Sequence, residues 1–393
     1  MDRLNSARFR LVVNTRSDPV SRPARPGLRE IDAALDEIER WPGYRATPLR
    51  DLRGLAVWAG IERLWYKDEG DRFGLASFKP MGGGYAVGCL LAREASRRLA
   101  RPVSPAHLAR GEHREVVADV TVTCATDGNH GRAVAWGART FGGRAVVYLA
   151  SHVSPGREHA IAEYGAQVVR TRGNHDEAVR TAAADARRQG WHVISETTNA
   201  SDPQIAADVL AGYGALVREG TTQTGGARPT HVFVQAGVGG LAAAACACTG
   251  QLWPTDPPSL IVVEAENADC VYRSLEAGER VAVEGELKTV MAGLAAGEVS
   301  AYAWEHLATG TAAAVVIADE PAIATLQILA ESAEGDDAFE AGESGVAGLA
   351  AALLVAHDPT ARTALTIDER SRILTIGTEG VTDRAIWRRL RNP

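Results

Sequence analysis

Short apolar runs rich in Val and Ile alternate with stretches of helical period over most of the chain. The apolar runs predict strands at residues 119–124, 144–149, 167–170, 193–195, 231–235, 259–264, 314–317 and 372–376. The spacing of apolar residues between them predicts helices that include residues 131–141, 175–189 and 322–332. Strands that alternate with helices of this length favour βαβ crossovers. The pattern therefore predicts an α/β fold with parallel sheets flanked by helices.

The composition is that of an ordinary globular protein. Of 393 residues, 46% are hydrophobic and 23% are charged, which excludes a disordered chain or a fibre. The longest apolar runs, at residues 241–248 and 349–356, are far too short to span a membrane. The net charge of −7 favours neither nucleic acid nor an acidic membrane as a partner. The opening residues carry arginines with no apolar stretch behind them, so no secretory signal is predicted.

The cysteines predict a cytoplasmic protein without a metal site. The five cysteines are scattered, and no second pair or histidine stands at zinc spacing from any of them. Small buried thiols in a reducing compartment are the simplest interpretation of such a set.

Only three of the 42 basic residues are lysines, so a reaction that needs a neutral amine has three candidates. Lys79 stands between Phe78 and the Pro/Gly-rich start of a helix, and both neighbours disfavour its ammonium form. An amine in that setting suits a Schiff base. Lys67 precedes two acidic residues and is expected to be structural, and Lys288 also follows acids.

A glycine-rich loop follows the predicted strand at 231–235. Glycines and the helix start behind them let backbone N–H groups surround a phosphate. The same loop fits a dinucleotide motif, because Gly237, Gly239 and Ala242 satisfy G-x-G-x-x-A and Glu264 ends the next strand. A tight turn between strand and helix, an NAD-binding dehydrogenase or sensor, and another phosphate ligand all remain open from this loop alone.

A second polar loop, at residues 125–132, follows the predicted strand at 119–124. It places the carboxylate of Asp127, the amide of Asn129 and the imidazole of His130 at the end of that strand. A capped helix start is the structural alternative. Because ligands of open parallel sheets collect at the carboxyl ends of strands, we favour a functional loop.

These motifs together resemble a known enzyme family. Ser77-Phe78-Lys79, the Asp-Gly-Asn-His-Gly loop at 127–131 and the glycine loop at 237–240 resemble fold-type-II pyridoxal-phosphate enzymes. Within that superfamily the chain is most similar to the diaminopropionate ammonia-lyases, through Ala-Thr-Asp-Gly-Asn-His-Gly-Arg at 125–132 and Met-Ala-Gly-Leu at 291–294. The resembling stretches run from about residue 42 to residue 380.

The resemblance implies a role for each matching position. Lys79 would bind pyridoxal 5'-phosphate covalently, with Phe78 beside the ring. Asn129 would hydrogen-bond the ring hydroxyl, and Thr378 would face the pyridine nitrogen. The phosphate would be held by backbone N–H groups of Gly237, Val238, Gly239, Gly240 and Leu241.

Asp127 discriminates among the activities that the resemblance implies. Related dehydratases carry a hydroxyl residue there, whereas a carboxylate suits a substrate whose leaving group is a β-ammonium and can accept a Cα proton. The resemblance thus implies α,β-elimination of ammonia from 2,3-diaminopropionate, which gives pyruvate and ammonia. Glu196 stands where a second catalytic aspartate is expected, and Pro80 is unusual beside the lysine. Elimination or replacement on another β-substituted amino acid therefore remains an alternative.

The resemblance also implies a two-domain enzyme. Residues 1–90 and 200–393 would form the large cofactor-binding domain, and residues 91–199 a small inserted α/β domain. The expected partner is a small amino-acid substrate. A homodimer is the default assembly of such enzymes.

Overall fold

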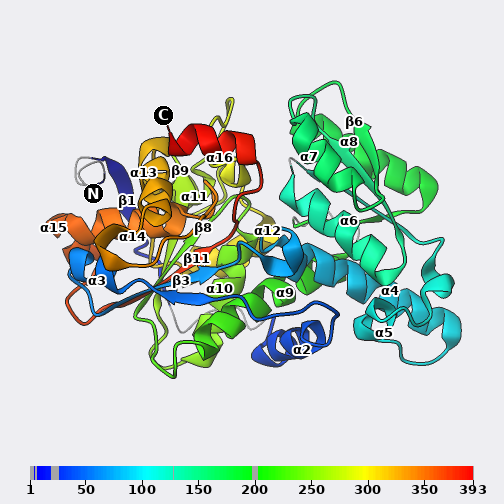
Figure 1. Cartoon of the computed structure of the whole chain (residues 1–393), viewed down its shortest axis with the longest axis horizontal. Coiled ribbons are helices and arrows are strands. Elements are labelled where there is room, and N and C mark those ends of the chain that lie inside the picture. The colour runs from blue at the N-terminus through cyan, green and yellow to red at the C-terminus, as the bar shows by residue number, and fades with distance from the viewer. Residues whose placement is uncertain (1–3, 5–6, 19–25, 127, 197–201, 393) are drawn as a thin grey trace. The chain divides into compact units, whose positions relative to one another are not determined.

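The computed structural model describes residues 4, 7–18, 26–126, 128–196 and 202–392, and these divide into two compact units. The first unit is built from Met1–Leu28, Ala46–Asp71 and Val217–Pro393, and the second from Arg29–Arg45 and Arg72–Leu216. Figure 1 colours the elements of both units by their position in the sequence.

The first unit contains a seven-stranded sheet, counted over the described residues, in the order β1-β10-β9-β8-β11-β3-β2. Its inner strands are parallel, whereas β1 and β2 at the two edges run antiparallel to β10 and β3. The strands are β1 (Phe9–Val13), β2 (Leu49–Asp51), β3 (Arg63–Asp68), β8 (His231–Gln235), β9 (Ser259–Ala265), β10 (Ala313–Ile317) and β11 (Arg372–Gly377).

Helices cover this sheet and bury its apolar strands. Every residue of β8 and of β10 is buried, which explains why both appear in the sequence as continuous apolar runs. Helix α14 packs on β8 and β11, and it is buried along almost its whole length. The helices of the unit are α3 (Arg53–Ala59), α10 (Gly240–Leu252), α11 (Cys270–Ala277), α12 (Ala301–Gly310), α13 (Asp319–Ala330), α14 (Ala347–His357), α15 (Pro359–Leu365) and α16 (Arg384–Arg391), with short turns η4 (Ala292–Leu294) and η5 (Ala333–Gly335).

The second unit contains a four-stranded parallel sheet in the order β6-β5-β4-β7. Alternate residues of β5 contact different helices: Val147 lies against α6, whereas Val146 and Tyr148 pack with α8. The sheet is therefore covered on both faces, as the sequence predicts. The strands are β4 (Thr121–Thr126), β5 (Arg144–Leu149), β6 (Gln167–Arg170) and β7 (His192–Val193). The helices are α2 (Leu28–Ile38), α4 (Tyr85–Leu99), α5 (Pro105–Ala109), α6 (Asn129–Phe141), α7 (Pro155–Ala162), α8 (His175–Gln189) and α9 (Pro203–Thr222), with short turns η1 (Arg72–Gly74), η2 (Pro80–Gly84) and η3 (Arg114–Val117). Helix α9 belongs to this unit as far as Leu216, and its end, from Val217, belongs to the first unit.

Glycines allow the turn η2 to pack closely in the second unit. A Cβ atom on Gly82 would lie 2.3 Å from Cε1 of Tyr213, and one on Gly84 would lie 2.8 Å from the ring of Trp136. On α9, a Cβ on Gly212 would lie 1.9 Å from the carbonyl oxygen of Met81. The Gly-rich sequence after Lys79 is thus required by close contacts on two sides.

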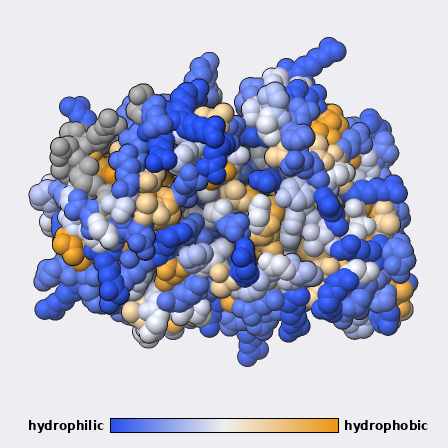
Figure 2. Space-filling view, viewed as in Figure 1, coloured by the Kyte–Doolittle hydropathy of each residue, from blue (hydrophilic) through white to orange (hydrophobic). Residues whose placement is uncertain are grey.

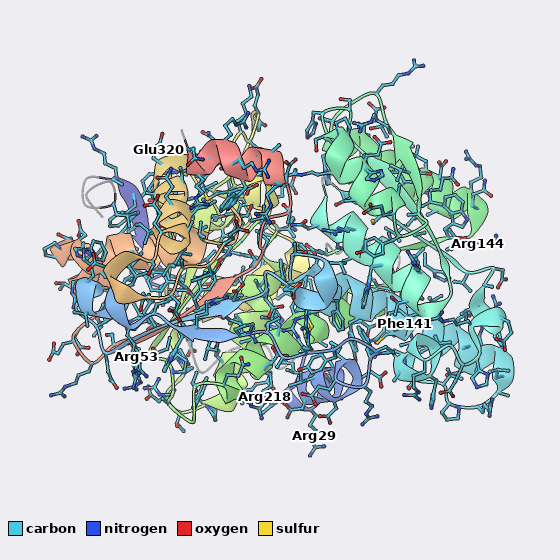
Figure 3. The ribbon with its side chains drawn as sticks, viewed as in Figure 1. Arg29, Arg53, Phe141, Arg144, Arg218 and Glu320 are labelled. Carbon is cyan, nitrogen blue, oxygen red and sulfur yellow. The ribbon has the colours of Figure 1, made fainter. Side chains whose placement is uncertain are left out.

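The described surface is mostly polar. Large hydrophobic residues exposed on it are Val13, Val57 and Val179, and the face in Figure 2 shows mainly hydrophilic residues with scattered apolar ones. Charged side chains such as Arg53 and Arg144 extend outward, whereas Phe141 is buried (Figure 3). Within the described ranges, no helix has the length and apolar character of a membrane span.

The structure confirms the predicted strands within about two residues and corrects three other points. The Arg/Pro-rich opening stretch, through residue 25, is typical of an arm that lies on the body of the protein, but it contains strand β1 at Phe9–Val13. Strands β2 and β3 were missed because charged residues interrupt them. The Gly- and Thr-rich sequence at 220–229 favours a loop, but helix α9 continues to Thr222. The bounds of the inserted domain, 91–199, stay a prediction; by their contacts residues 29–45 also fall in the second unit, and so do residues 72–90 and 202–216. The last two segments group with it because α4 and η2 pack on α6, and Tyr213 of α9 packs on η2.

Candidate active site

Lys79 lies at the start of η2 and is paired with Glu196. Its Nζ donates hydrogen bonds to Oε1 and Oε2 of Glu196 at 2.6 and 2.9 Å. Both side chains are largely buried, with exposed fractions of 18% and 14%. This carboxylate comes from a segment 117 residues away, so the neighbours of the lysine in the sequence do not reveal it. In this structure the amine of Lys79 is therefore held by a largely buried carboxylate.

Aromatic rings flank this amine. The Nζ of Lys79 lies 4.8 Å from the ring centroid of Phe78 and 5.7 Å from that of Tyr213. The two rings are themselves 4.7 Å apart and tilted by 39°. Their packing gives the lysine an apolar surround on one side and the carboxylate on the other.

Three described side chains lie around the carboxylate of Glu196. Besides Lys79, the hydroxyl of Tyr213 donates a hydrogen bond to its Oε1, and Nδ1 of His130 lies 3.3 Å from the same oxygen. Burial opposes ionisation, but Lys79 and His130 outweigh it and hold the pKa of Glu196 below the usual range of a glutamate. Glu196 is therefore an ionised carboxylate beside the candidate amine.

A threonine hydroxyl holds the polar loop after β4 in shape through hydrogen bonds to its backbone. The Oγ1 of Thr126 accepts hydrogen bonds from the backbone N–H groups of Gly128 and Gly131, at 3.0 and 3.1 Å. Asn129, predicted to contact the cofactor ring, is the first residue of α6. Asp127, the predicted base, lies outside the described residues. The structure thus brings Lys79, Glu196 and His130 together and leaves the role of Asp127 a prediction.

In the first unit, the glycine loop joins β8 to α10. Gly239 has a left-handed backbone conformation (φ +93°), and it provides no side chain to cap the helix that begins at Gly240. A Cβ on Gly237 would lie 3.1 Å from the carbonyl oxygen of Gly293, so that position too is confined. An uncapped helix N-terminus with close backbone approach suits a phosphate group.

A buried glutamine organises the end of β11 near this loop. The Nε2 of Gln235 donates to Oγ1 of Thr378 at 2.8 Å, and it lies 3.0–3.1 Å from the carbonyl oxygens of Ser344, Gly345 and Ile376. Because Oγ1 of Thr378 accepts this bond, the hydroxyl proton of Thr378 is free to donate to another acceptor. A pyridine nitrogen is an acceptor of the required kind.

Glu264 is occupied by the helix that follows it. Its Oε1 accepts from the backbone N–H of Val271 at 2.8 Å, and its Oε2 accepts from that of Tyr272 at 2.7 Å. The Sγ of Cys270 lies 3.5 Å from Oε1. A carboxylate used in this way stabilises the N-terminus of α11, so it does not serve the ribose of a dinucleotide. This observation argues against the NAD alternative.

Sequence reasoning missed Tyr213 and Gln235. Tyr213 lies in the middle of an apolar helix and Gln235 at the end of an apolar strand, where a single polar group is ordinarily a satisfied core residue. Gly82 leaves room for the ring of Tyr213. The sequence shows the glycine, but only the structure shows which ring fills the space beside it.

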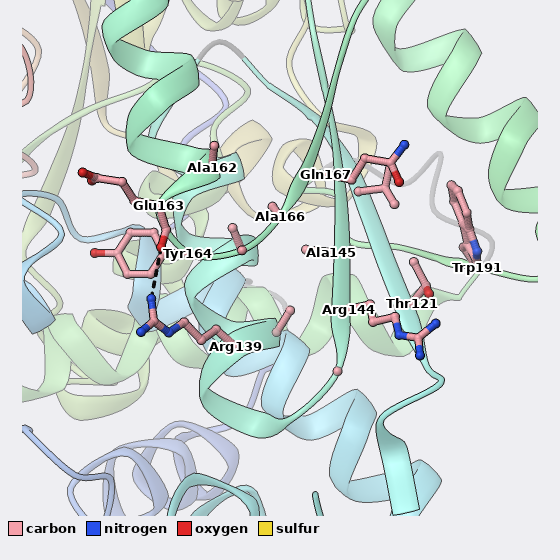
Figure 4. Close-up of a pocket in the computed structure, with 15 residues that line it drawn as sticks. Thr121, Arg139, Arg144, Ala145, Ala162, Glu163, Tyr164, Ala166, Gln167 and Trp191 are labelled. Carbon is pink, nitrogen blue, oxygen red and sulfur yellow. Dashed lines mark hydrogen bonds between the residues drawn. The ribbon is translucent and has the colours of Figure 1, made fainter. Parts of the chain in front are cut away.

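A pocket elsewhere in the second unit contains none of the predicted site residues. It lies beside the starts of strands, at Thr121, Arg144 and Gln167, and is also lined by Arg139 and Trp191 (Figure 4). The predicted residues follow the opposite, carboxyl ends of strands. Among the described residues, no cluster of three or more potential ligands could hold a metal ion.

Comparisons with known proteins agree on one family. The sequence matches the model of the family described as "Pyridoxal-phosphate dependent enzyme" over residues 40–379. Diaminopropionate ammonia-lyase of Salmonella typhimurium (strain LT2) is 35% identical over 358 residues, which are 89% of this chain and 88% of that protein. The selenomethionine holo structure of diaminopropionate ammonia lyase from Escherichia coli has a TM-score of 0.88 and 31% identity, over 98% of this chain and 97% of that chain. The complex of the same Escherichia coli enzyme with D-serine matches with the same values.

The residues present fit such a cofactor. The second unit offers a buried amine at Lys79, and the first unit offers the uncapped helix start after Gly239 and the donor hydroxyl of Thr378. These groups suit an aldehyde, a phosphate and a pyridine nitrogen respectively. The chain belongs to the pyridoxal-phosphate dependent enzymes.

Proposed function

We propose that the protein is a diaminopropionate ammonia-lyase, which converts 2,3-diaminopropionate and water into pyruvate and ammonia. The relatives that share about a third of its residues over most of its length carry this name. The observation that supports the assignment most directly is the ionised carboxylate of Glu196 beside Lys79. A carboxylate beside the reactive amine attracts a diamino acid and can accept a proton from its Cα.

We infer which residues hold the cofactor from their chemistry. Lys79 provides the amine, with Phe78 beside the ring, and Asn129 donates to the ring hydroxyl. The backbone N–H groups of Gly237, Val238, Gly239, Gly240 and Leu241 hold the phosphate. When bound, pyridoxal 5'-phosphate withdraws electrons from the Cα of the amino acid. The neutral hydroxyl of Thr378 hydrogen-bonds the pyridine nitrogen without giving it a full proton, which favours elimination over transamination.

The carboxylates move the proton. Asp127 or Glu196, depending on the handedness of the substrate, accepts the Cα proton, and the β-amino group leaves as ammonia. A second ammonia and pyruvate form when water completes the reaction. Both carboxylates also favour a cationic substrate over an uncharged one.

The roles of the two carboxylates can be distinguished with the two enantiomers of the substrate. A pair of variants tests which carboxylate serves which enantiomer. Asp127→Asn and Glu196→Gln are each expected to lower kcat/KM about 100-fold or more, because each removes a general base. Each variant should affect one enantiomer of diaminopropionate far more than the other. Pyruvate release measured with each enantiomer provides the check. If both variants retain full activity on both enantiomers, neither carboxylate is the base.

A different β-substituted amino acid is the second candidate substrate, because Glu196 is one methylene longer than the expected aspartate. The relative from Escherichia coli has been solved with D-serine, which carries a hydroxyl as its β-substituent. Release of ammonia and of the 2-oxo acid, which is 2-oxobutyrate from threonine and pyruvate from the others, should be measured on diaminopropionate, serine, threonine and cysteine side by side. Diaminopropionate is expected to give the highest kcat/KM, and a higher value for another substrate would replace it.

The glycine loop offers a test of cofactor binding. Gly239→Ala is expected to weaken the binding of pyridoxal 5'-phosphate about tenfold, which equals ~1.4 kcal/mol or one hydrogen bond. The reason is that the new Cβ would lie 3.0 Å from Leu307 and displace the loop. Gly225→Ala is a matched control, because Gly225 also has a positive φ (+67°) but has open space around it. Equal affinity in both variants would remove the loop from the cofactor site.

We also propose that the enzyme is a cytoplasmic homodimer. Support comes from the homodimer as the default assembly of such enzymes and from the scattered positions of the five cysteines in the sequence. Light scattering after gel filtration at several protein concentrations decides the assembly.

A further inference from the structure

Glu196 needs a support that an aspartate in its place would not need. The extra methylene adds a rotatable bond, so the carboxylate has more positions to sample and loses more entropy when it is fixed. A general base must nevertheless stay within hydrogen-bond reach of the proton it takes. Lys79 is the residue proposed to bind the cofactor. Its amine therefore cannot hold Glu196 in one position throughout the reaction. The remaining contacts come from Tyr213 and His130.

Tyr213 is held by close packing beside this carboxylate. Its side chain is fully buried (0% exposed). The space left by Gly82 accommodates one edge of the ring, and the ring of Phe78 lies 4.7 Å away. A ring confined on both sides can direct its hydroxyl to one place only. That place is Oε1 of Glu196.

The direction of this hydrogen bond is defined by the chemistry of the pair. Burial, followed by the charge of Glu196, raises the pKa of Tyr213 well above the usual value for tyrosine. The hydroxyl therefore keeps its proton and donates it to the ionised carboxylate. Hydrogen bonds from a neutral donor to a charged acceptor are among the stronger ones in proteins.

His130 provides a second, weaker support. Its Nε2 lies 3.0 Å from the carbonyl oxygen of Ile194, which can only accept, so Nε2 carries a hydrogen. Its Nδ1 lies 3.3 Å from Oε1 of Glu196. The thiol of Cys124 is the other titratable group near Glu196 among the described residues, and burial raises its pKa so that it stays neutral.

We propose that Tyr213 is a positioning residue for the base Glu196, and that its hydroxyl holds the longer carboxylate in the orientation that accepts the Cα proton. This inference rests on the proposed function, since it assigns Tyr213 to the reaction of one enantiomer. Asp127, which serves the other enantiomer in that proposal, has no part in it.

Tyr213→Phe tests the proposal, because it removes one hydroxyl and keeps the ring that packs against Gly82. We expect kcat/KM to fall about tenfold for the enantiomer that is sensitive to Glu196→Gln, and to stay within about twofold for the other. The lost donor stabilised the ionised carboxylate, so the acid limb of the pH profile should move upward by about one pH unit. Glu196→Asp, which leaves Tyr213 in place but shortens the reach of the carboxylate, should cause a loss for the same enantiomer.

Tyr148→Phe is the matched control. Tyr148 is also buried, and its hydroxyl donates to a carboxylate, that of Asp185, in a different part of the second unit. This variant should reproduce any general cost of losing a buried tyrosine hydroxyl and leave both enantiomers and the pH profile unchanged. Equal losses for both enantiomers in Tyr213→Phe, or no loss for either, would overturn the positioning role.

A measurement without substrate separates this inference from the proposed function. The visible absorption of the bound cofactor, titrated with pH, reports the charge around the nitrogen of residue 79. In Tyr213→Phe, Oε1 of Glu196 has one donor fewer and stabilises positive charge on that nitrogen more strongly. The titration midpoint should therefore rise by about half a pH unit or more, whereas Tyr148→Phe keeps the wild-type midpoint. An unchanged midpoint in Tyr213→Phe overturns the inference even if the enzyme turns over diaminopropionate. A wild-type enzyme inactive on diaminopropionate overturns the proposed function, and the midpoint then still decides the contact.

Discussion

Lys79→Ala is expected to abolish both activity and the covalent attachment of the cofactor. Activity should fall by at least about 1,000-fold, because the variant lacks the amine that joins pyridoxal 5'-phosphate to the chain. Borohydride reduction of the wild-type protein should fix a pyridoxyl group on the peptide that contains residue 79, as judged by mass spectrometry. The same treatment of Lys79→Ala should fix none.

The other two lysines make this test specific. Lys288 is exposed and paired with Glu286, so Lys288→Ala should keep the pyridoxyl group and full activity. Lys67 is buried among hydrogen-bond acceptors and is not available to an aldehyde. A pyridoxyl group found on residue 67 or 288 would show that the site has been placed on the wrong amine.

Lys67→Met should destabilise the first unit by about 3–5 kcal/mol, the cost of breaking a buried ion pair by removing one partner. The Nζ of Lys67 donates to the carbonyl oxygen of Thr47 at 2.6 Å, to Oε1 of Gln223 at 2.9 Å and to Oε1 of Glu219. Oε1 of Glu69 lies 3.9 Å from it. The lysine and both carboxylates have exposed fractions of 4% or less, so solvent does not screen the pair. The free energy of unfolding in urea is the measurement.

Two variants control for this effect. Lys288→Met removes an exposed lysine from its pair with Glu286 and should change stability by less than about 0.5 kcal/mol. The double variant Lys67→Met/Glu219→Gln removes a charge of each sign and should be more stable than Lys67→Met alone. A single variant as stable as the wild type would mean that the ammonium contributes nothing to the fold.

The sequence was sufficient to predict the strands and helices whose apolar residues follow a single, regular spacing. Strands β5, β6 and β8 and helix α8 begin and end at the predicted residues, because their apolar pattern is unbroken and turn residues flank them. Strand β3 escaped prediction because Lys67, Asp68 and other polar residues interrupt its pattern. These groups are buried through partners from distant parts of the chain, such as Glu219, and no local pattern reports such partners.

The candidate site shows the same limit. Lys79 could be found from the scarcity of lysines and its glycine-rich surroundings, and the phosphate loop from its glycines after a strand. The carboxylate that pairs with Lys79 could not be found in this way, because Glu196 is 117 residues away in sequence. Tyr213 and Gln235 look like core residues until their hydroxyl and amide are seen to contact Glu196 and Thr378.

The glycines around η2 restrict how this enzyme can diverge. Gly82 and Gly212 admit no side chain, because a neighbouring ring or carbonyl already occupies the space. Gene duplicates that drift toward new substrates therefore cannot enlarge or narrow the wall behind the lysine by ordinary substitutions at these positions. Changes in substrate preference must then come from the polar residues that face the amine. An exchange between aspartate and glutamate at residue 196 is the smallest change of that kind.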